Sequence, residues 1–454
     1  MKKIILYSIS FIIVISTSVV LFEAFFKIIP IAYKSIKKSD SNSYVYILGE
    51  SSSYGTPYSE KISFAKLIKC KLNNRIDNKK IKLIIFAYPG SRLIHQYFKY
   101  LYYKYTHPFH KGIVLLYIGT NNWAVAPTTN VNKSLLLKFN IKKLLDYYCK
   151  YQYDFKSDYE NIILLAKKFG DDIYISTISG NYSGFMPNNA APLLNADFLY
   201  EIDNLILSKK YQDALDKCNR ILKQHDDQSQ ILYRIGKIFE KQNKIKEAKK
   251  VYLNAIEYNY DTRPTRYQNN VIKKLAAKYN IPVTDIFEKL NNSDEIVGYN
   301  FFVDNIHPNI KLHELIAEGF IELLSKKYQL SINKNLTEEV ILKMVEFNEQ
   351  DLFALHRDIL GSIILHSYNN GILNRFNLEI IKQHMVILKN MVHDNEQKRT
   401  LLFFDALWQY INGNKEETLK IIINNDLIRY FDDVKIAYWN FYFKNWFINL
   451  IKTK

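Results

Sequence analysis

The stretch Tyr44-Val45-Tyr46-Ile47-Leu48-Gly49-Glu50-Ser51 decides the fold, because it is an apolar run that ends in a glycine, an acid and a serine. Its apolar part is continuous and rich in aromatic and β-branched residues, as is typical of a strand buried on both faces of a parallel sheet. Four later runs share this pattern: Lys82–Ala87, Ile113–Ile118, Ile173–Ile178 and Pro282–Ile286. Helical stretches separate the runs, which predicts right-handed crossovers and an α/β fold with a doubly wound, three-layer parallel sheet.

Short polar motifs follow the ends of these strands. Glu50-Ser51 follows the first strand, Gly90 the second and Asn121-Asn122 the third, and the segment from Asp304 to His307 comes much later. In doubly wound sheets the ligand site lies beyond the carboxyl ends of the strands. We therefore predict that the four motifs meet in one site.

The side chains in these motifs suit acyl transfer. Serine attacks a carbonyl carbon only when a base removes its proton, and the imidazole of His307 can do so for Ser51 near neutral pH. Asp304 precedes the histidine by three residues, a spacing that predicts both side chains on one side of a helical turn. The backbone N–H groups of Ser51 and Gly90 and the side-chain amide of Asn121 are candidate donors for the oxyanion. Each residue alone has an ordinary structural explanation, and only their joint occurrence favours a site.

This constellation resembles the SGNH, or GDSL-like, hydrolase superfamily. Four blocks carry the resemblance: Ile47–Gly55, Ala87–Gly90, Tyr117–Asn122 and Phe302–Asn309. The resemblance extends over about residues 43–326 and implies an esterase with Ser51, Asp304 and His307 as catalytic residues. Glu50 and Asn122 stand where the family usually has aspartate, in supporting positions. No cofactor or metal is implied.

Residues 191–262 interrupt the predicted sheet with a helical pattern of their own. Within residues 229–261, small and large residues stand at the offsets of a tetratricopeptide repeat, in which two antiparallel helices approach closely. They are Leu232, Ile235, Gly236, Phe239, Ala248, Tyr252 and Ala255. Ala214 stands one repeat period before Ala248, which predicts a degenerate earlier repeat over Phe198–Gln224. The predicted insert could bind a protein partner or buttress the α/β domain.

The amino-terminal segment Ile4–Phe26 contains one charged residue, Glu23. It is long enough to cross the hydrocarbon core of a bilayer, which needs about 20 residues. No small-residue cleavage site precedes Phe25-Phe26-Lys27, so the segment predicts an uncleaved membrane helix rather than a signal peptide. The positive-inside rule is balanced between the two flanks, and we expect the tail inside and the catalytic domain extracytoplasmic.

These patterns predict five regions. Residues 1–39 are an anchor and linker, residues 40–190 and 263–328 are the two parts of the hydrolase domain, and residues 191–262 are the inserted repeats. Residues 329–454 form a carboxyl-terminal helical region, in which Leu401–Asn424, with Ala406 and Gly413, could be another degenerate repeat.

Composition limits the partners of the chain. The 454 residues, 48% of them hydrophobic, suffice for more than one domain. The net charge of +17 comes from lysines spread along the chain, which indicates a solvated surface and no nucleic-acid partner. Three cysteines, Cys70, Cys149 and Cys218, show no metal-ligand spacing.

The resemblance implies cleavage or transfer of an acyl ester. With an anchor and an extracytoplasmic face, the expected acyl carrier is a glycan of the bacterial cell envelope, with a lipid second. Two alternatives stay open: a membrane-anchored polysaccharide O-acetyltransferase, and a repeat-containing scaffold that binds proteins and whose catalytic site has decayed.

Overall fold

The computed structural model describes most of the chain from Asn42 onward. The described residues are 42–58, 60–121, 154–187, 195–224, 229–257, 263–333, 336–369, 372–427, 443, 446–448, 450 and 451. The predicted anchor at 4–26 and the supporting residue Asn122 lie outside these ranges.

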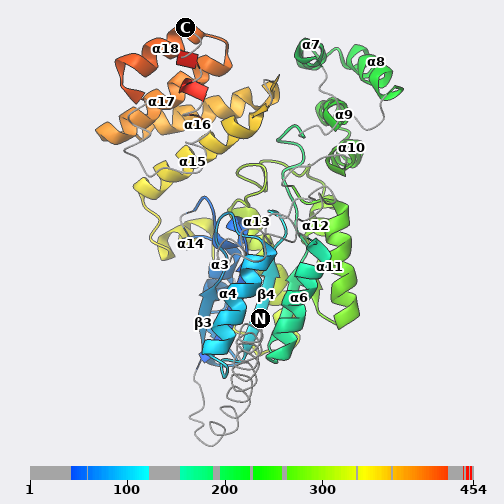
Figure 1. Ribbon diagram of the computed structural model, residues 1–454, viewed down its shortest axis with the longest axis vertical. Helices are drawn as coiled ribbons and strands as arrows, with labels where there is room; N and C mark the ends of the chain where they lie inside the picture. Colours follow the sequence, from blue (N-terminus) through cyan, green and yellow to red (C-terminus); the bar gives the residue numbers. More distant parts are fainter. Residues whose placement is uncertain are drawn as a thin grey trace, which may run out of the picture.

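A six-stranded sheet forms the centre of the α/β part (Figure 1). Its strands are β1 (Asn42–Gly49), β2 (Arg75–Ile76), β3 (Lys79–Ile85), β4 (Gly112–Tyr117), β5 (Asp172–Ser176) and β6 (Val283–Thr284). They lie in the order β2-β3-β1-β4-β5-β6, and all neighbours pair in parallel except β2 with β3. The prediction of an α/β chain with a mostly parallel sheet is confirmed.

The two edge strands, β2 and β6, differ most from the prediction. The edge strand β2 was not predicted; it joins β3 through Asp77 and Asn78, whose φ angles of 50° and 60° are those of a tight hairpin turn. The strand predicted over residues 282–286 is two residues long, because the Asp285 side chain accepts a hydrogen bond from the backbone N–H of Glu288 and begins the next helix.

Helices cover both faces of the sheet (Figure 1). Those of the α/β part are α2 (Ser51–Tyr54), α3 (Phe64–Lys71), α4 (Leu93–Thr106), α6 (Phe155–Lys168), α11 (Arg266–Tyr279), α12 (Ile286–Asn291) and α13 (Ile310–Ser325). Helices α3 and α13 pack together on one side, and α6 packs with both α4 and α11 on the other. Strands β1 and β4 between these layers are almost completely buried, which explains why their sequences are continuously apolar.

Four helices are inserted between β5 and α11. They are α7 (Ala196–Leu207), α8 (Tyr211–Leu222), α9 (Ser229–Lys241) and α10 (Ile245–Glu257), and successive helices pack against one another. Gly236 of α9 faces α10 so closely that a Cβ atom would lie 2.5 Å from the ring of Tyr252. Ala248 and Ala255 are buried, as the repeat pattern requires. The helices therefore lie where they were expected, and their assignment as tetratricopeptide repeats stays a prediction.

The carboxyl-terminal region is mainly helical. It contains α14 (Glu338–Met344), α15 (Glu349–Ser367), η3 (Arg375–Asn377), α16 (Leu378–Asn390), α17 (Asn395–Ile411) and α18 (Lys415–Asn424). A two-stranded ribbon, β7 (Tyr368–Asn369) and β8 (Ile372–Leu373), was not predicted. Gly413, with φ of 83°, makes the turn between α17 and α18. Figure 1 shows this region and the insert as two helical groups at the same end of the sheet.

Membrane attachment is the prediction that requires correction. Among the residues that the structure describes, no helix is both long enough and apolar enough to cross a bilayer. This finding contradicts the predicted transmembrane helix and the membrane-anchored, extracytoplasmic location, whose basis, residues 4–26, falls outside the described ranges. Neither enters the function proposed below.

Candidate active site

Two motifs from distant parts of the chain meet at the end of β1. The hydroxyl Oγ of Ser51 lies 2.8 Å from His307 Nε2, and His307 Nδ1 lies 2.6 Å from Asp304 Oδ2. All three residues are buried, with 6%, 5% and 3% of their surface exposed. Because Nδ1 faces a carboxylate, it carries the imidazole proton, which leaves Nε2 free to accept the proton of the serine.

Ser51 is the first residue of α2, and its two neighbours have other partners. Ser52 Oγ donates to the carbonyl of Ile306 at 3.2 Å, and Ser53 Oγ donates to the carbonyl of Tyr117 at 2.6 Å. Gly49 makes this packing possible, since a Cβ there would lie 2.1 Å from Ser53 Oγ. Of the three consecutive hydroxyls, only that of Ser51 contacts the imidazole.

The segment from Asp304 to His307 forms a tight turn and not the helical turn that its spacing predicted. Phe302 and Pro308 pair in an antiparallel bridge that closes the turn. Inside it, Asp304 Oδ1 accepts the backbone N–H groups of Ile306 and His307 at 3.0 and 2.8 Å. The aspartate therefore holds both the backbone and the ring of the histidine.

Asp304 is a carboxylate in this environment. Burial alone would raise its pKa, but the neighbouring His307 and the hydrogen bonds from the histidine ring, the histidine backbone and Ile306 lower the pKa well below its usual range. A fixed negative charge behind the imidazole stabilises the imidazolium that forms during proton transfer.

Glu50 organises the loop that carries Asn121. Its Oε2 accepts the backbone N–H groups of Gly119, Thr120 and Asn121 at 3.2, 2.7 and 3.1 Å, together with the Thr120 hydroxyl. Burial raises the pKa of the Glu50 carboxyl to about 6, against the lowering effect of these hydrogen bonds. The Glu50 side chain, which is longer than that of aspartate, thus reaches from the end of β1 to the loop after β4.

The candidate oxyanion donors lie on neighbouring loops. Asn121 Nδ2 donates to the carbonyl of Ser91 at 3.0 Å, which leaves its second N–H for another acceptor. Ser91 Oγ lies 3.1 Å from the carbonyl of Gly49, so the loops after β1, β3 and β4 are joined at this point. Gly90 has a φ of 73°, which favours glycine, and a Cβ there would meet no atom within 4 Å. In the described turns and loops, no backbone carbonyl accepts the N–H group of Ser51 or Gly90.

Sequence reasoning missed two residues close to this site. Ser362 of α15 donates its hydroxyl to Asp304 Oδ2 at 2.8 Å. Asn181, in the loop after β5, donates its amide to the carbonyl of Asp304 at 2.9 Å. Neither residue belongs to a local motif, since each meets the aspartate only through the tertiary fold.

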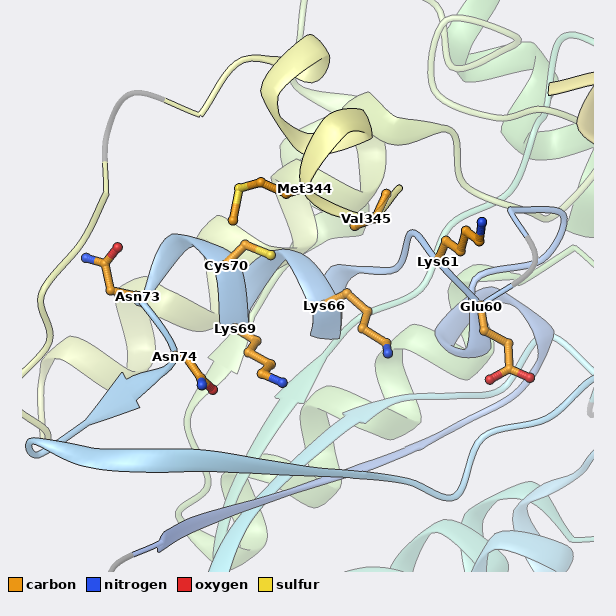
Figure 2. Close-up of a pocket in the computed structure, with 9 residues that line it drawn as sticks. All are labelled: Glu60, Lys61, Lys66, Lys69, Cys70, Asn73, Asn74, Met344 and Val345. Carbon is orange, nitrogen blue, oxygen red and sulfur yellow. The ribbon is translucent and has the colours of Figure 1, made fainter. Parts of the chain in front are cut away.

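A separate groove of about 510 Å³ lies between α3 and α14 (Figure 2). Figure 2 shows Met344, the last residue of α14, and Val345, which follows it, on one side of the groove and Cys70 of α3 opposite. Ser51, Asp304 and His307 do not line it. In the described ranges, no group of three or more histidine, cysteine, aspartate or glutamate side chains is placed to hold a metal ion.

Comparisons with known proteins find likeness only among solved structures. No family model and no curated protein matches the chain. An esterase from Pseudoalteromonas sp., solved with monoethylphosphonate as inhibitor, is 12% identical, and the match covers 63% of this chain and 97% of the esterase (TM-score 0.31). A catalytic mutant of an acetylxylan esterase from Geobacillus stearothermophilus is 10% identical, with 62% and 94% covered (TM-score 0.33).

A lipase/acylhydrolase from Enterococcus faecalis is also similar. It is 10% identical to this chain, and the match covers 64% of this chain and all of the enzyme, with a TM-score of 0.29. The similar structures are thus esterases and acylhydrolases.

Proposed function

We propose that the protein is a serine hydrolase that cleaves acyl esters, with Ser51 as nucleophile, His307 as general base and Asp304 as the group that orients the base. The observation that carries the proposal is the continuous hydrogen-bonded line from Ser51 Oγ through the imidazole to the Asp304 carboxylate. Few other functions require a buried serine, histidine and aspartate in this order.

The reaction follows from the positions of the donors and acceptors. His307 Nε2 takes the hydroxyl proton as Ser51 Oγ attacks the ester carbonyl, and the imidazolium then gives that proton to the departing alkoxide. An acyl-enzyme on Ser51 remains, and water activated by the same imidazole hydrolyses it to the free acid. The backbone N–H groups of Ser51 and Gly90 and the Asn121 amide are the proposed donors to the negatively charged oxygen. The predicted carriers of the acyl group, a cell-envelope glycan or a lipid, stay predictions.

The assignment of the helical groups is a proposal of the same kind. We propose that α7–α10 are two tetratricopeptide-like repeats inserted between the two parts of the hydrolase domain, with domain limits at residues 40–190, 191–262, 263–328 and 329–454. The supporting observations are the four helices themselves and the close approach of Gly236 to Tyr252.

A fluorophosphonate probe, which reacts with activated serines, tests the hydrolase proposal. We expect the wild-type protein to be labelled and the Ser51→Ala variant to remain unlabelled. Ser53→Ala is the matched control, because it removes a buried hydroxyl of the same helix that bonds to a backbone carbonyl. Equal labelling of wild type and Ser51→Ala would refute the proposal. No labelling of either would refute it and favour the scaffold alternative.

Hydrolysis and acyl transfer are separated by the acceptor. If the protein is a hydrolase, acetate release from p-nitrophenyl acetate in buffer should proceed at the same rate whether or not a polysaccharide is added. Faster turnover with the polysaccharide, together with acetylated product, would instead identify an O-acetyltransferase.

A further inference from the structure

Among the described residues, the hydroxyl of Ser362 joins the carboxyl-terminal helical region to the candidate active site. Ser362 lies in the second half of α15, and its hydroxyl donates to Asp304 Oδ2 at 2.8 Å. This is the oxygen that also accepts His307 Nδ1. Ser362 is 3% exposed, so water does not compete for the carboxylate at this position.

A shared apolar core holds helix α15 against the loop that carries Asp304 and His307. The residues Tyr58, Ile62, Val303 and Ile310 of the α/β part belong to the same buried cluster as Ile359, Leu360, Ile363 and Ile364 of α15. Two of these, Val303 and Ile310, flank the segment from Asp304 to His307. The apolar core therefore fixes Ser362 at the depth of the carboxylate.

A polar contact at the edge of this core sets the position of the same helix. Lys61 Nζ lies 2.7 Å from Asp351 Oδ2, in the first turn of α15, and donates to the carbonyl of Glu346 just before the helix. Figure 2 shows Lys61 on the α/β side and the end of α14 above it. The start of α15 is thus fixed by an ion pair and its middle by apolar packing.

We propose that Ser362 is a positioning residue for Asp304, and hence that the carboxyl-terminal region completes the active site. The inference rests on the hydrolase function proposed above. Asp304 Oδ1 is held by two backbone N–H groups, whereas Oδ2 has the imidazole and the Ser362 hydroxyl. Without that hydroxyl, the only hydrogen bond to Oδ2 among the described residues comes from the ring that the carboxylate must orient.

The expected effect is on turnover and not on substrate binding. Ser362 contacts neither the nucleophile nor the candidate oxyanion donors, so its loss leaves the ester-binding surface intact. A displaced imidazole, however, slows every proton transfer, and misplacements of about 1 Å can cost roughly 100-fold in rate. Loss of one of the two partners of Oδ2 should displace the imidazole by less than about 1 Å, so we expect kcat to fall by roughly tenfold.

The experiment compares five full-length proteins: wild type, Ser51→Ala, Ser362→Ala, Ser362→Cys and Ser367→Ala. Ser367 is the matched control, because it is a fully buried serine of the same helix whose hydroxyl accepts a hydrogen bond from Asn377 instead of contacting Asp304. Steady-state hydrolysis of p-nitrophenyl acetate gives kcat and KM, and urea unfolding gives stability. We expect Ser362→Ala to lose roughly tenfold in kcat with KM within about twofold, Ser362→Cys to be intermediate because a thiol is a weaker donor, and Ser367→Ala to keep wild-type kcat.

The possible outcomes separate the inference from the function on which it rests. A kcat of Ser362→Ala within about twofold of wild type, or an equal loss in Ser367→Ala, overturns the positioning role. If Ser362→Ala does not unfold cooperatively, the cysteine variant decides: a wild-type kcat overturns the role and a lowered kcat at unchanged KM supports it. Hydrolysis by Ser51→Ala at the wild-type rate overturns the proposed function itself, and this inference with it.

Discussion

The Glu50 carboxyl predicts a measurable link between pH and stability. Burial raises its pKa from 4.5 to about 6 in the folded protein, so the folded state binds the proton more tightly than the unfolded chain does. The stabilisation from this proton is complete below pH 4.5, declines as the pH rises from 4.5 to 6, and is absent above pH 6. A shift of this size corresponds to about 2 kcal/mol of unfolding free energy.

Glu50→Gln removes the titration while keeping the size of the side chain. Urea unfolding of wild type and variant should be followed at pH 4 and pH 7, and the difference between their unfolding free energies compared. We expect wild type to gain about 2 kcal/mol relative to the variant as the pH falls from 7 to 4. Since all other titrating groups are common to both proteins, they cancel in this difference.

Glu50→Asp serves as the control. It retains a buried carboxyl, so its stability should depend on pH in the same direction as that of wild type. A wild-type advantage over Glu50→Gln that is identical at pH 4 and pH 7 would show that Glu50 does not titrate as its burial requires. The hydrogen bonds from the loop after β4 would then offset the effect of burial on the Glu50 carboxyl.

Three further substitutions have definite expected outcomes. Gly49→Ala places a Cβ 2.1 Å from Ser53 Oγ, and we expect it to lower the free energy of unfolding in urea by about 1–3 kcal/mol and to reduce kcat; wild-type values of both would contradict the packing at the end of β1. Gly236→Ala places a Cβ 2.5 Å from the Tyr252 ring and should destabilise by a similar 1–3 kcal/mol, roughly, while kcat for p-nitrophenyl acetate stays unchanged. Asp304→Asn should lower kcat by about 10⁴ and slow fluorophosphonate labelling in parallel; a variant that labels at the wild-type rate would remove Asp304 from the proposed mechanism.

The sequence predicted the sheet well where a strand is buried on both faces. β1 and β4 carry continuous apolar runs that end at glycine, and their observed limits differ from the predicted ones by only one or two residues. The edge strand β2 has only two residues and no such run, so periodicity could not find it. β6 was predicted too long because Asp285, read as part of the strand, acts as a helix cap.

Only those residues of the candidate site that stand in local sequence motifs could be predicted. Ser51, Asp304 and His307 stand in short motifs, and the fold brings them into contact. The turn around Asp304 could not be foreseen, because the spacing of two side chains does not distinguish a helical turn from one closed by a backbone bridge. Ser362 was equally invisible, since a serine in an amphipathic helix has no local sign of a partner 58 positions away.

The long sequence separation between Ser51 and His307 delays assembly of the candidate site during translation. The two residues are 256 positions apart, and at translation rates of roughly 5–20 residues per second the serine exists for about 13–50 s before its histidine is made. The ribosome must add α15 as well before Ser362 can meet Asp304. During synthesis, therefore, a fragment that ends before His307 carries Ser51 without the base that the proposed mechanism requires.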